Sequence, residues 1–294
     1  MSPPQTTSQL FPILCKRNNH YRDQYLLFDE PTHKYTIITD PQSSYTSVTT
    51  WNHSHFPAFN ADNIIKKMMA SKNWNEKNKY WGMTPQQIKN LWSANAKDVS
   101  GAGTSLHFDI ECFMNQYIVD EDDQDYVYDH SILLEHYNEQ IDDGMAPPNT
   151  SIEWAYFIDY IKNFPDFVPY RTEWMIYDEE LKLAGSIDMV YENNDGSLCI
   201  YDWKRSKEIS KFNNFNECAT THCIRHLPNS NYWHYSLQLN TYKAILERKY
   251  GKSVKDLYLV RLHPNHTSYQ LIKCADLQNE VKLLFEYRKN ELNK

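Results

Sequence analysis

The chain has 294 residues, and its 30 Lys and Arg against 38 Asp and Glu give a formal net charge of −8. This charge excludes a globally basic nucleic-acid-binding protein, for which a high isoelectric point is the expected signature. Hydrophobic residues make up 41% of the chain, which excludes a disordered protein, and no apolar run approaches the roughly 20 residues that span a bilayer.

The negative charge is concentrated in one segment. Residues 120–143 hold ten of the acids and no Lys or Arg, so the rest of the chain has 28 acids and 30 bases, a net charge of +2. The rest of the molecule is therefore free to have a basic face. We predict that this acidic segment is a loop or a partly helical, solvated insert.

The cysteines and the N-terminus indicate the compartment. Six cysteines lie far apart at irregular spacings, which is typical of reduced thiols inside the cell. The N-terminus has no charged region followed by a long apolar region, so no secretory signal is expected. Cys218 and Cys223 lie near histidines but fit no common zinc or iron–sulfur spacing. We expect an intracellular protein (cytoplasm, nucleus or viral factory), not secreted, with no membrane segment and no iron–sulfur cluster.

The first hundred residues are predicted to form a hairpin followed mainly by helices. Asn60 is a typical N-cap residue, and Thr84 followed by Pro85 is a typical helix start. In chain order, this region is predicted to contain a hairpin over 25–29 and 34–39 and helices over 60–71 and 84–96.

The remaining two thirds alternate between helical and strand patterns. Thr150 with Glu153 forms a capping box, and three later strand patterns separated by turn residues predict an antiparallel meander. In chain order, we predict helices over 103–117 and 150–164, strands over 171–177, 181–191 and 197–203, a helix over 231–250, strands over 256–262 and 269–274, and a helix over 277–290. No repeat or Gly/Ser linker divides the chain, so one compact unit is expected.

Two strands of this meander carry the residues with the clearest chemistry. Asp188 lies on the second strand and Asp202 on the third, and because strand side chains alternate, Asp202 and Lys204 point to the same side. Two carboxylates suit a hard cation such as Mg²⁺, which can activate water and neutralise charge on a phosphodiester. A nearby Lys can orient that water or shield negative charge.

An acid-x-Lys triplet is weak evidence without its structural context. The chain contains four, at Glu180/Lys182, Asp202/Lys204, Glu247/Lys249 and Glu280/Lys282. Only Asp202/Lys204 ends an apolar strand that pairs with another strand carrying an acid. The alternative explanation for this triplet is a surface ion pair at a strand end.

A further candidate lies on the helix predicted over 103–117. His107 and Glu111 are four residues apart, which places them on one helix face, and an imidazole added to carboxylates favours Mn²⁺. On its own, His107 is better explained as a structural histidine. Gly101 and Gly103 precede it and suggest a close backbone approach to a phosphate.

Taken in order, these motifs resemble the PD-(D/E)XK nuclease superfamily. The resemblance rests on GAGTSLHFDIE at 101–111, GSID at 185–188, DWK at 202–204 and the QxxxY spacing of Gln238 and Tyr242. Within this superfamily, the chain more specifically resembles the RecB-like exonucleases, including the mitochondrial genome-maintenance type. Similar proteins occur in large DNA viruses. Ile187 replaces the Pro of the family name, the second acid is Asp, and neither a four-cysteine cluster motif nor a Walker P-loop is present.

The resemblance implies an α/β fold with a restriction-endonuclease-like αβββαβ core, a mixed sheet flanked by helices. That core would span residues 101–275, with the acidic insert at 120–143, after a mainly helical N-terminal region and before a C-terminal helix at 276–294. It implies a deoxyribonuclease that uses one or two Mg²⁺ or Mn²⁺ ions, and it favours an exonuclease acting on DNA ends in replication, recombination or repair. The alternatives are a structure-specific endonuclease and a non-catalytic nucleic-acid-binding or scaffold module.

Residue roles follow from the same resemblance. The implied partner is DNA, single-stranded or with a free end, together with replication or recombination proteins. Asp188, Asp202 and Lys204 would be catalytic, and the metal ligands would be His107, Asp188, Asp202 and the backbone carbonyl of Trp203. Residues that orient these groups or contact substrate would be Glu111, Glu173, Gln238 and Tyr242. The expected DNA contacts are Arg205, Lys207, Lys211, Thr104 and Ser105.

The N-terminal helical region offers a second DNA-binding surface. It interleaves Lys66, Lys67, Lys72, Lys77, Lys79, Lys89 and Lys97 with Trp74, Trp81 and Trp92. Basic residues interleaved with aromatic rings suit the gripping of a nucleic-acid strand. The alternative is that the tryptophans form core and the lysines a solvated face. The acidic segment is expected to lie away from the DNA path.

Overall fold

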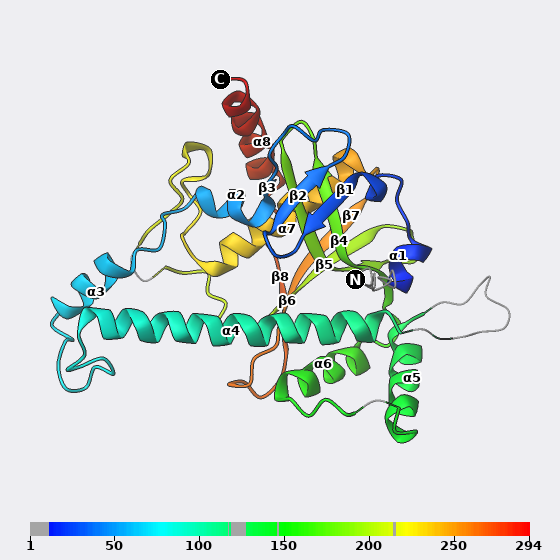
Figure 1. Ribbon diagram of the computed structural model, residues 1–294, viewed down its shortest axis with the longest axis horizontal. Helices are drawn as coiled ribbons and strands as arrows, with labels where there is room; N and C mark the ends of the chain where they lie inside the picture. The colour runs from blue at the N-terminus through cyan, green and yellow to red at the C-terminus, as the bar shows by residue number, and fades with distance from the viewer. Residues whose placement is uncertain (1–11, 117, 119–127, 146, 214–215) are drawn as a thin grey trace, which may run out of the picture.

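The computed structural model describes residues 12–116, 118, 128–145, 147–213 and 216–294 (Figure 1). The first part contains α1 (Ile13–Arg17), η1 (Asp23–Tyr25), β1 (Leu26–Asp29), β2 (Lys34–Ile37), β3 (Thr46–Ser47), α2 (Val48–Ser54), α3 (Ala61–Met69) and α4 (Pro85–Met114). The second part contains α5 (His130–Asp142), α6 (Ile152–Asn163), β4 (Val168–Asp178), β5 (Leu183–Glu192), β6 (Leu198–Lys204), η2 (His222–Ile224), α7 (Asn231–Lys249), β7 (Val254–Arg261), β8 (Gln270–Lys273) and α8 (Gln278–Leu292).

A mixed sheet forms the centre of the fold, as predicted. Strands β4, β5 and β6 are the antiparallel meander, β7 pairs with β6 in parallel, and β8 pairs with β7 in an antiparallel sense. The long connection through α7 allows the parallel pairing of β6 and β7, which a tight turn could not. The short strand β3 adds to β5 in parallel, at Thr46 and Ser47. This order agrees with the expected αβββαβ core.

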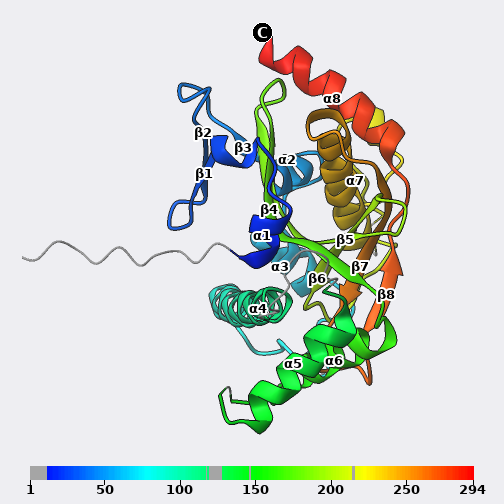
Figure 2. The same cartoon turned by 90° about the vertical axis from the view of Figure 1, so that its right-hand side faces the viewer.

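Helices cover both faces of the sheet (Figure 2). One apolar cluster packs α2, α7 and α8 against one face, and it includes Leu237, Ile245 and Ile200. A second cluster packs α4, α5 and α6 against the other face, and it includes Phe157 and Trp203. Because alternate residues of β6 point to opposite faces, Trp203 enters the second cluster while Asp202 and Lys204 point to the α7 side.

The helices predicted over 84–96 and 103–117 are one helix, α4, so the predicted break is wrong. Thr84 caps α4 in a complete capping box with Gln87, as its sequence indicates. Gly101 and Gly103 then lie inside the helix, where each costs about 1 kcal/mol relative to Ala. Propagation adds one hydrogen bond for each further residue, so a long helix can absorb that cost. The helix also runs through the domain boundary expected at residue 100.

Two other sequence predictions need correction. The N-cap of α6 is Ser151, whose Oγ accepts a hydrogen bond from the Trp154 amide, so the capping box predicted at Thr150 and Glu153 is wrong by one residue. The second half of the acidic segment is helical, which agrees with the predicted alternative of a partly helical insert, and Asp129 caps this helix, α5. The helix is not a fully solvated insert, because its Leu133 is buried in the core. Residues 119–127 lie outside the described residues.

Five short elements were not expected from the sequence: α1, η1, β3, α2 and η2. Ser47 caps α2 by accepting a hydrogen bond from the Thr50 amide, and Val48 and Trp51 of α2 are buried against the sheet. This places α2 beside α7, at the edge of the sheet where β3 joins β5. Within the described part of the chain, every helix is too short or too polar to cross a membrane.

Candidate active site

The candidate site lies where β5 and β6 separate. The two strands pair from Met189 with Tyr201 to Glu192 with Leu198, whereas the last residues of β6 pair only with β7. The Asp188 carboxylate spans this fork, since its Oδ2 accepts a hydrogen bond from the Trp203 amide at 3.1 Å. The backbone amide that would otherwise have continued the ladder therefore orients a carboxylate.

Glu173 on β4 lies opposite Asp188. Thr172 pairs with Met189 and Trp174 with Ile187, which leaves Glu173 and Asp188 facing each other across the strands. Glu173 adopts a φ of 42°, a left-handed conformation that costs a residue with a side chain about 1–3 kcal/mol. Its Oε2 accepts a hydrogen bond from the Ser186 hydroxyl at 2.8 Å.

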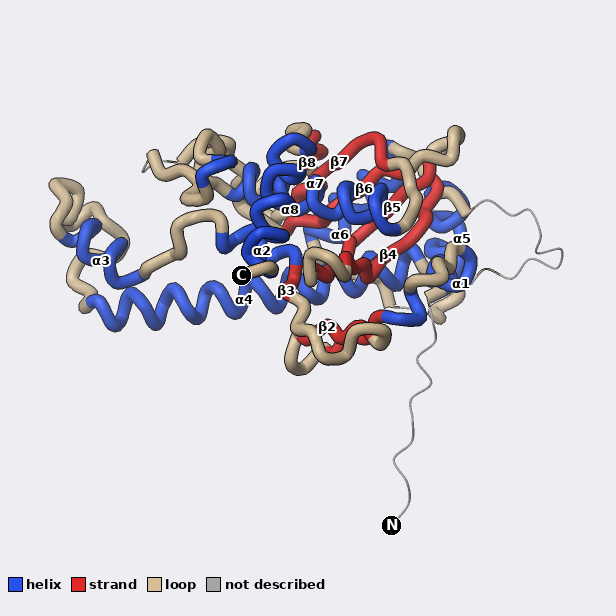
Figure 3. The backbone as a smooth tube through the Cα atoms, turned by 90° about the horizontal axis from the view of Figure 1, so that it is seen from above, coloured by secondary structure: helices blue, strands red, loops and turns tan. Residues whose placement is uncertain are grey.

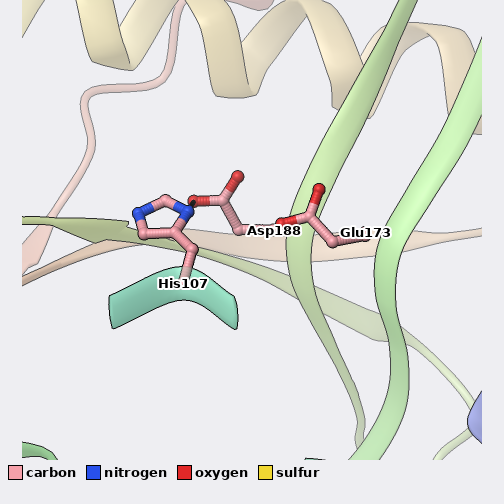
Figure 4. Close-up of side chains that lie close together, drawn as sticks. All are labelled: His107, Glu173 and Asp188. Carbon is pink, nitrogen blue, oxygen red and sulfur yellow. Dashed lines mark ion pairs between the residues drawn. The ribbon is translucent and has the colours of Figure 1, made fainter. Parts of the chain in front are cut away.

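His107 reaches the same point from α4 (Figure 4). Its Nε2 lies 2.9 Å from the Trp203 carbonyl oxygen, and because a carbonyl can only accept, Nε2 carries the hydrogen. The other ring nitrogen, Nδ1, then faces Asp188, 3.5 Å from Oδ2. Ligand atoms of His107, Glu173 and Asp188 all lie within 4.8 Å of one another. We call these three residues the ligand cluster.

The third predicted acid, Asp202, is held differently. Its Oδ2 lies 2.5 Å from Nζ of Lys204, so the two groups form a buried ion pair beside the ligand cluster. Lys204 Nζ also lies 4.8 Å from the centre of the Tyr235 ring on α7. The structure thus brings His107 and Asp188 together as predicted, adds Glu173 to them, and leaves Asp202 facing Lys204.

The electrostatics of the site follow from burial and crowded carboxylates. Burial and then the charge of Asp188 raise the pKa of Glu173 to about 7. Burial raises the pKa of Asp202 to about 6, although Lys204 opposes the shift. For Lys204, burial alone would lower the pKa, but the carboxylates of Asp202 and Asp188 outweigh it and raise the pKa. Like charges that face each other across two strands are destabilising, so a cation between them would be stabilising.

Gln238 and Tyr242 form one wall of the site, from α7. The Gln238 amide donates to the Tyr242 hydroxyl at 3.1 Å and to Thr49 Oγ1 of α2 at 3.2 Å. Tyr242 in turn lies against Gly185 of β5. The QxxxY pair is therefore connected to strand β5 and to a helix that the sequence did not predict. Thr49 offered no signal in the sequence, because Thr46, Thr49 and Thr50 lie close together and no motif distinguishes one from the others.

The other expected substrate contacts vary in availability. Burial raises the pKa of Glu111, which lies one helical turn beyond His107. Arg205 is paired with Glu153, with Nε 2.7 Å from Oε1. Lys207 is exposed, and Lys211 Nζ lies 4.6 Å from the centre of the Tyr232 ring.

The expectation of a phosphate-binding helix start near Gly101 and Gly103 is wrong. These glycines lie in the interior of α4, far from its N-terminal turn. Thr104 and Ser105 donate their hydroxyls back to the helix carbonyls of Ser100 and Gly101. Both side chains are exposed, so they remain expected DNA contacts, but no free helix N-terminus lies beside them.

The donor set of the ligand cluster fits a divalent cation. Carboxylate oxygens suit Mg²⁺ and Mn²⁺, and an imidazole nitrogen is better tolerated by Mn²⁺. Each donor is oriented by a second contact: Glu173 by Ser186, Asp188 by the Trp203 amide and His107 by the Trp203 carbonyl. Such contacts are typical of metal ligands, whose orientation and basicity they adjust.

Comparison with known proteins identifies the family. A model of the PD-(D/E)XK nuclease superfamily matches residues 128–291. The chain therefore belongs to the PD-(D/E)XK nuclease superfamily, whose members are hydrolases that cleave nucleic acid with divalent metal ions. The matched range includes Glu173, Asp188, Asp202 and Lys204, whereas His107 and the rest of α4 precede it.

The other comparisons add little to this assignment. No curated protein matches the chain. Among solved structures, the chain is similar to a crystal structure of a candidate exonuclease from Eubacterium rectale, with 12% identity, coverage of 57% of this chain and 70% of that one, and a TM-score of 0.30. At that identity and TM-score, the likeness supports no conclusion about substrate or reaction.

Proposed function

We propose that this protein is a Mg²⁺- or Mn²⁺-dependent DNA exonuclease of the RecB-like branch that acts on DNA ends in replication, recombination or repair. The observation that carries the proposal is the ligand cluster of His107, Glu173 and Asp188 beside the Asp202–Lys204 pair. A structural role does not require two carboxylates to face each other across a strand pair with an imidazole nitrogen within 4.8 Å of both.

The proposed roles follow from these contacts. His107, Glu173 and Asp188 would hold a divalent ion, which when bound would supply Lewis acidity for the phosphodiester and would lower the pKa of a water molecule. Lys204 places a positive charge beside the acids, where it shields negative charge that builds on the cleaved phosphate. Asp202 keeps Lys204 in place, and Asp202 and the Trp203 carbonyl remain proposed ligands of the same or a second ion.

The test is cleavage of end-labelled linear DNA, single- and double-stranded, with Mg²⁺ or Mn²⁺. Wild-type protein should release nucleotides, and Lys204→Ala should lower the rate by at least about 100-fold, as loss of one stabilising charge typically does. Lys255→Ala is the matched control, because Lys255 is exposed at the start of β7, away from the fork. Equal rates for wild type and Lys204→Ala would refute the proposed catalytic site.

A covalently closed circular substrate separates the alternatives. An exonuclease leaves the circle intact, whereas a structure-specific endonuclease opens it. A non-catalytic scaffold would cleave neither substrate and would bind Mn²⁺ no more weakly after Asp188→Asn. The family assignment and the oriented ligand side chains favour an active nuclease over a non-catalytic scaffold.

A further inference from the structure

A projecting unit, residues 57–97, extends from the body of the protein. We call it the arm; it consists of α3, the segment after it and the first half of α4. Figures 1 and 3 show α3 and this half of α4 extending to one side, away from the sheet. Ile65 and Ile88 are buried within the arm, and Lys89 pairs with Asp62, 2.5 Å apart. Neither isoleucine belongs to the three apolar clusters of the body.

The part of α4 that joins the arm to the site carries no packing. Every residue from 93 to 101 is exposed. A helix that is polar all round and bridges two parts through solvent needs other support, which here comes from its packed ends. The arm is thus held out from the body, and its surface is not part of the core.

The charge of the arm is opposite to that of the whole chain. Residues 57–97 contain seven Lys, no Arg and only two acids, a net charge of +5 in a protein of net charge −8. Lys89 is neutralised by Asp62. Within the described residues, the remaining six lysines form no ion pair and are exposed; they are Lys66, Lys67, Lys72, Lys77, Lys79 and Lys97.

Aromatic rings lie among these lysines at the surface. Trp81 is 47% exposed, and its ring centre is 5.7 Å from that of Trp74. Phe59 is 74% exposed, and its ring centre is 6.1 Å from that of Trp92. Bases can stack on such exposed rings in a sequence-tolerant way, because every base has a π face. Stacking requires unpaired bases, so this surface suits a single strand rather than a duplex.

We propose that the arm binds single-stranded DNA and holds it ahead of the ligand cluster. The part of this inference that directs the strand toward the ligand cluster rests on the proposed nuclease function. Lys89 and His107 are 18 residues apart on one helix, so the packed part of the arm around Ile88 and Lys89 lies about 27 Å from the site at a rise of about 1.5 Å per residue. At about 3.4 Å per stacked nucleotide, a strand needs about eight nucleotides to reach both.

The test is binding of fluorescein-labelled oligothymidylates of 4 and 24 nucleotides, followed by anisotropy in EDTA so that no cleavage occurs. Trp81→Ala should weaken binding of the 24-mer about tenfold or more. The wild-type protein should bind the 24-mer more tightly than the 4-mer, because only the longer strand can reach both the arm and the site. Tyr287→Ala is the matched control, because Tyr287 is 44% exposed but lies on α8. Lys66→Gln combined with Lys67→Gln removes no packed atom and should lower the salt slope by about 1.4.

Each outcome decides the inference. Equal affinity of the wild-type protein for the two lengths, an unchanged 24-mer affinity in both arm variants, or tighter binding of a 24-base-pair duplex than of the 24-mer would overturn it. A protein-binding arm would give the second of these results. Arm-dependent binding without any metal-dependent cleavage would refute the proposed nuclease function but support the binding of single-stranded DNA by the arm. Metal-dependent cleavage of the 24-mer, with an affinity that is unchanged in the arm variants, would support the nuclease function and refute binding by the arm.

Discussion

Tyr242 occupies the space into which a side chain at Gly185 would project. A Cβ at residue 185 would lie 2.8 Å from Cε1 of Tyr242 and 3.1 Å from its hydroxyl oxygen. The glycine of the GSID strand and the tyrosine of the QxxxY helix are therefore one steric unit. Because the hydroxyl of Tyr242 also accepts from Gln238, movement of the ring would disturb the wall of the site.

Gly185→Ala should lower the free energy of unfolding by about 1–3 kcal/mol, since the buried Tyr242 ring has no free space to move into. Urea unfolding followed by circular dichroism measures the change. Gly101→Ala is the control, because nothing lies within 4 Å of a Cβ there and Ala is about 1 kcal/mol better than Gly within a helix. An unchanged midpoint for Gly185→Ala would contradict the steric coupling.

The ligand cluster predicts which residues control metal affinity. Asp188→Asn and Glu173→Gln should each weaken Mn²⁺ binding at least about tenfold, because each removes a negatively charged donor. Isothermal titration calorimetry in the absence of DNA measures this directly. Glu192→Gln changes an exposed acid at the far end of β5 and should have no effect. An unchanged Mn²⁺ affinity in Glu173→Gln would show that Glu173 does not bind the ion directly.

His130 should make stability fall as the pH becomes acidic. Burial lowers its pKa to about 3, and its Nε2 lies 2.9 Å from the Tyr191 hydroxyl. Between the ordinary histidine pKa and about 3, the unfolded chain binds a proton that the folded chain does not. The contribution is therefore complete above pH 6.5 and is lost as the pH falls.

In His130→Phe, the loss of stability between pH 6 and 5 should be smaller by up to about 1.4 kcal/mol per pH unit. Urea unfolding at several pH values measures the slopes, with the exposed His222→Gln as control. Burial also lowers the pKa of His55 and His234 to about 4, so the wild-type slope contains further contributions of the same sign. Parallel curves for wild type and His130→Phe would contradict the linkage.

The acidic segment can be tested without disrupting the core. Deleting all of residues 120–143 would remove α5, whose Leu133 is buried, so loss of activity would be ambiguous. The combined substitution Glu135→Gln, Glu139→Gln and Asp142→Asn changes only exposed side chains of α5. We expect the rate of DNA cleavage to stay within about twofold of wild type, since screening weakens surface charges beyond about 10 Å. A large change in KM would place α5 beside the DNA.

The strands that carry the candidate site, β5 and β6, could be predicted from the sequence because the patterns that indicate them are local. Asp202 and Lys204 are two residues apart, so strand alternation alone puts them on one face. Glu173 required one further step, since its contact with Asp188 depends on the register between β4 and β5. The acidic turn that joins these strands constrains that register, and a count along both strands would have paired the two carboxylates.

Features that depend on distant contacts were less accessible. The unbroken course of α4 is fixed by packing at its two ends, whereas local propensity at Gly101 and Gly103 favours a break. The strand β3 is two residues long and exists only because Thr46 pairs with Leu183, far along the chain. The orientation of Asp202 toward Lys204 likewise depends on the charges that surround it in the folded site, which include Asp188.

One helix carries both the arm and His107, and this links the two by helical phase. Each residue of an α-helix turns the chain by about 100°, so inserting a single residue between Val99 and His107 would swing the arm about 100° around the helix axis. Inserting seven or eleven residues would nearly restore its direction and only lengthen the reach. In a lineage of such proteins, the length of the exposed span is therefore expected to vary in whole numbers of turns.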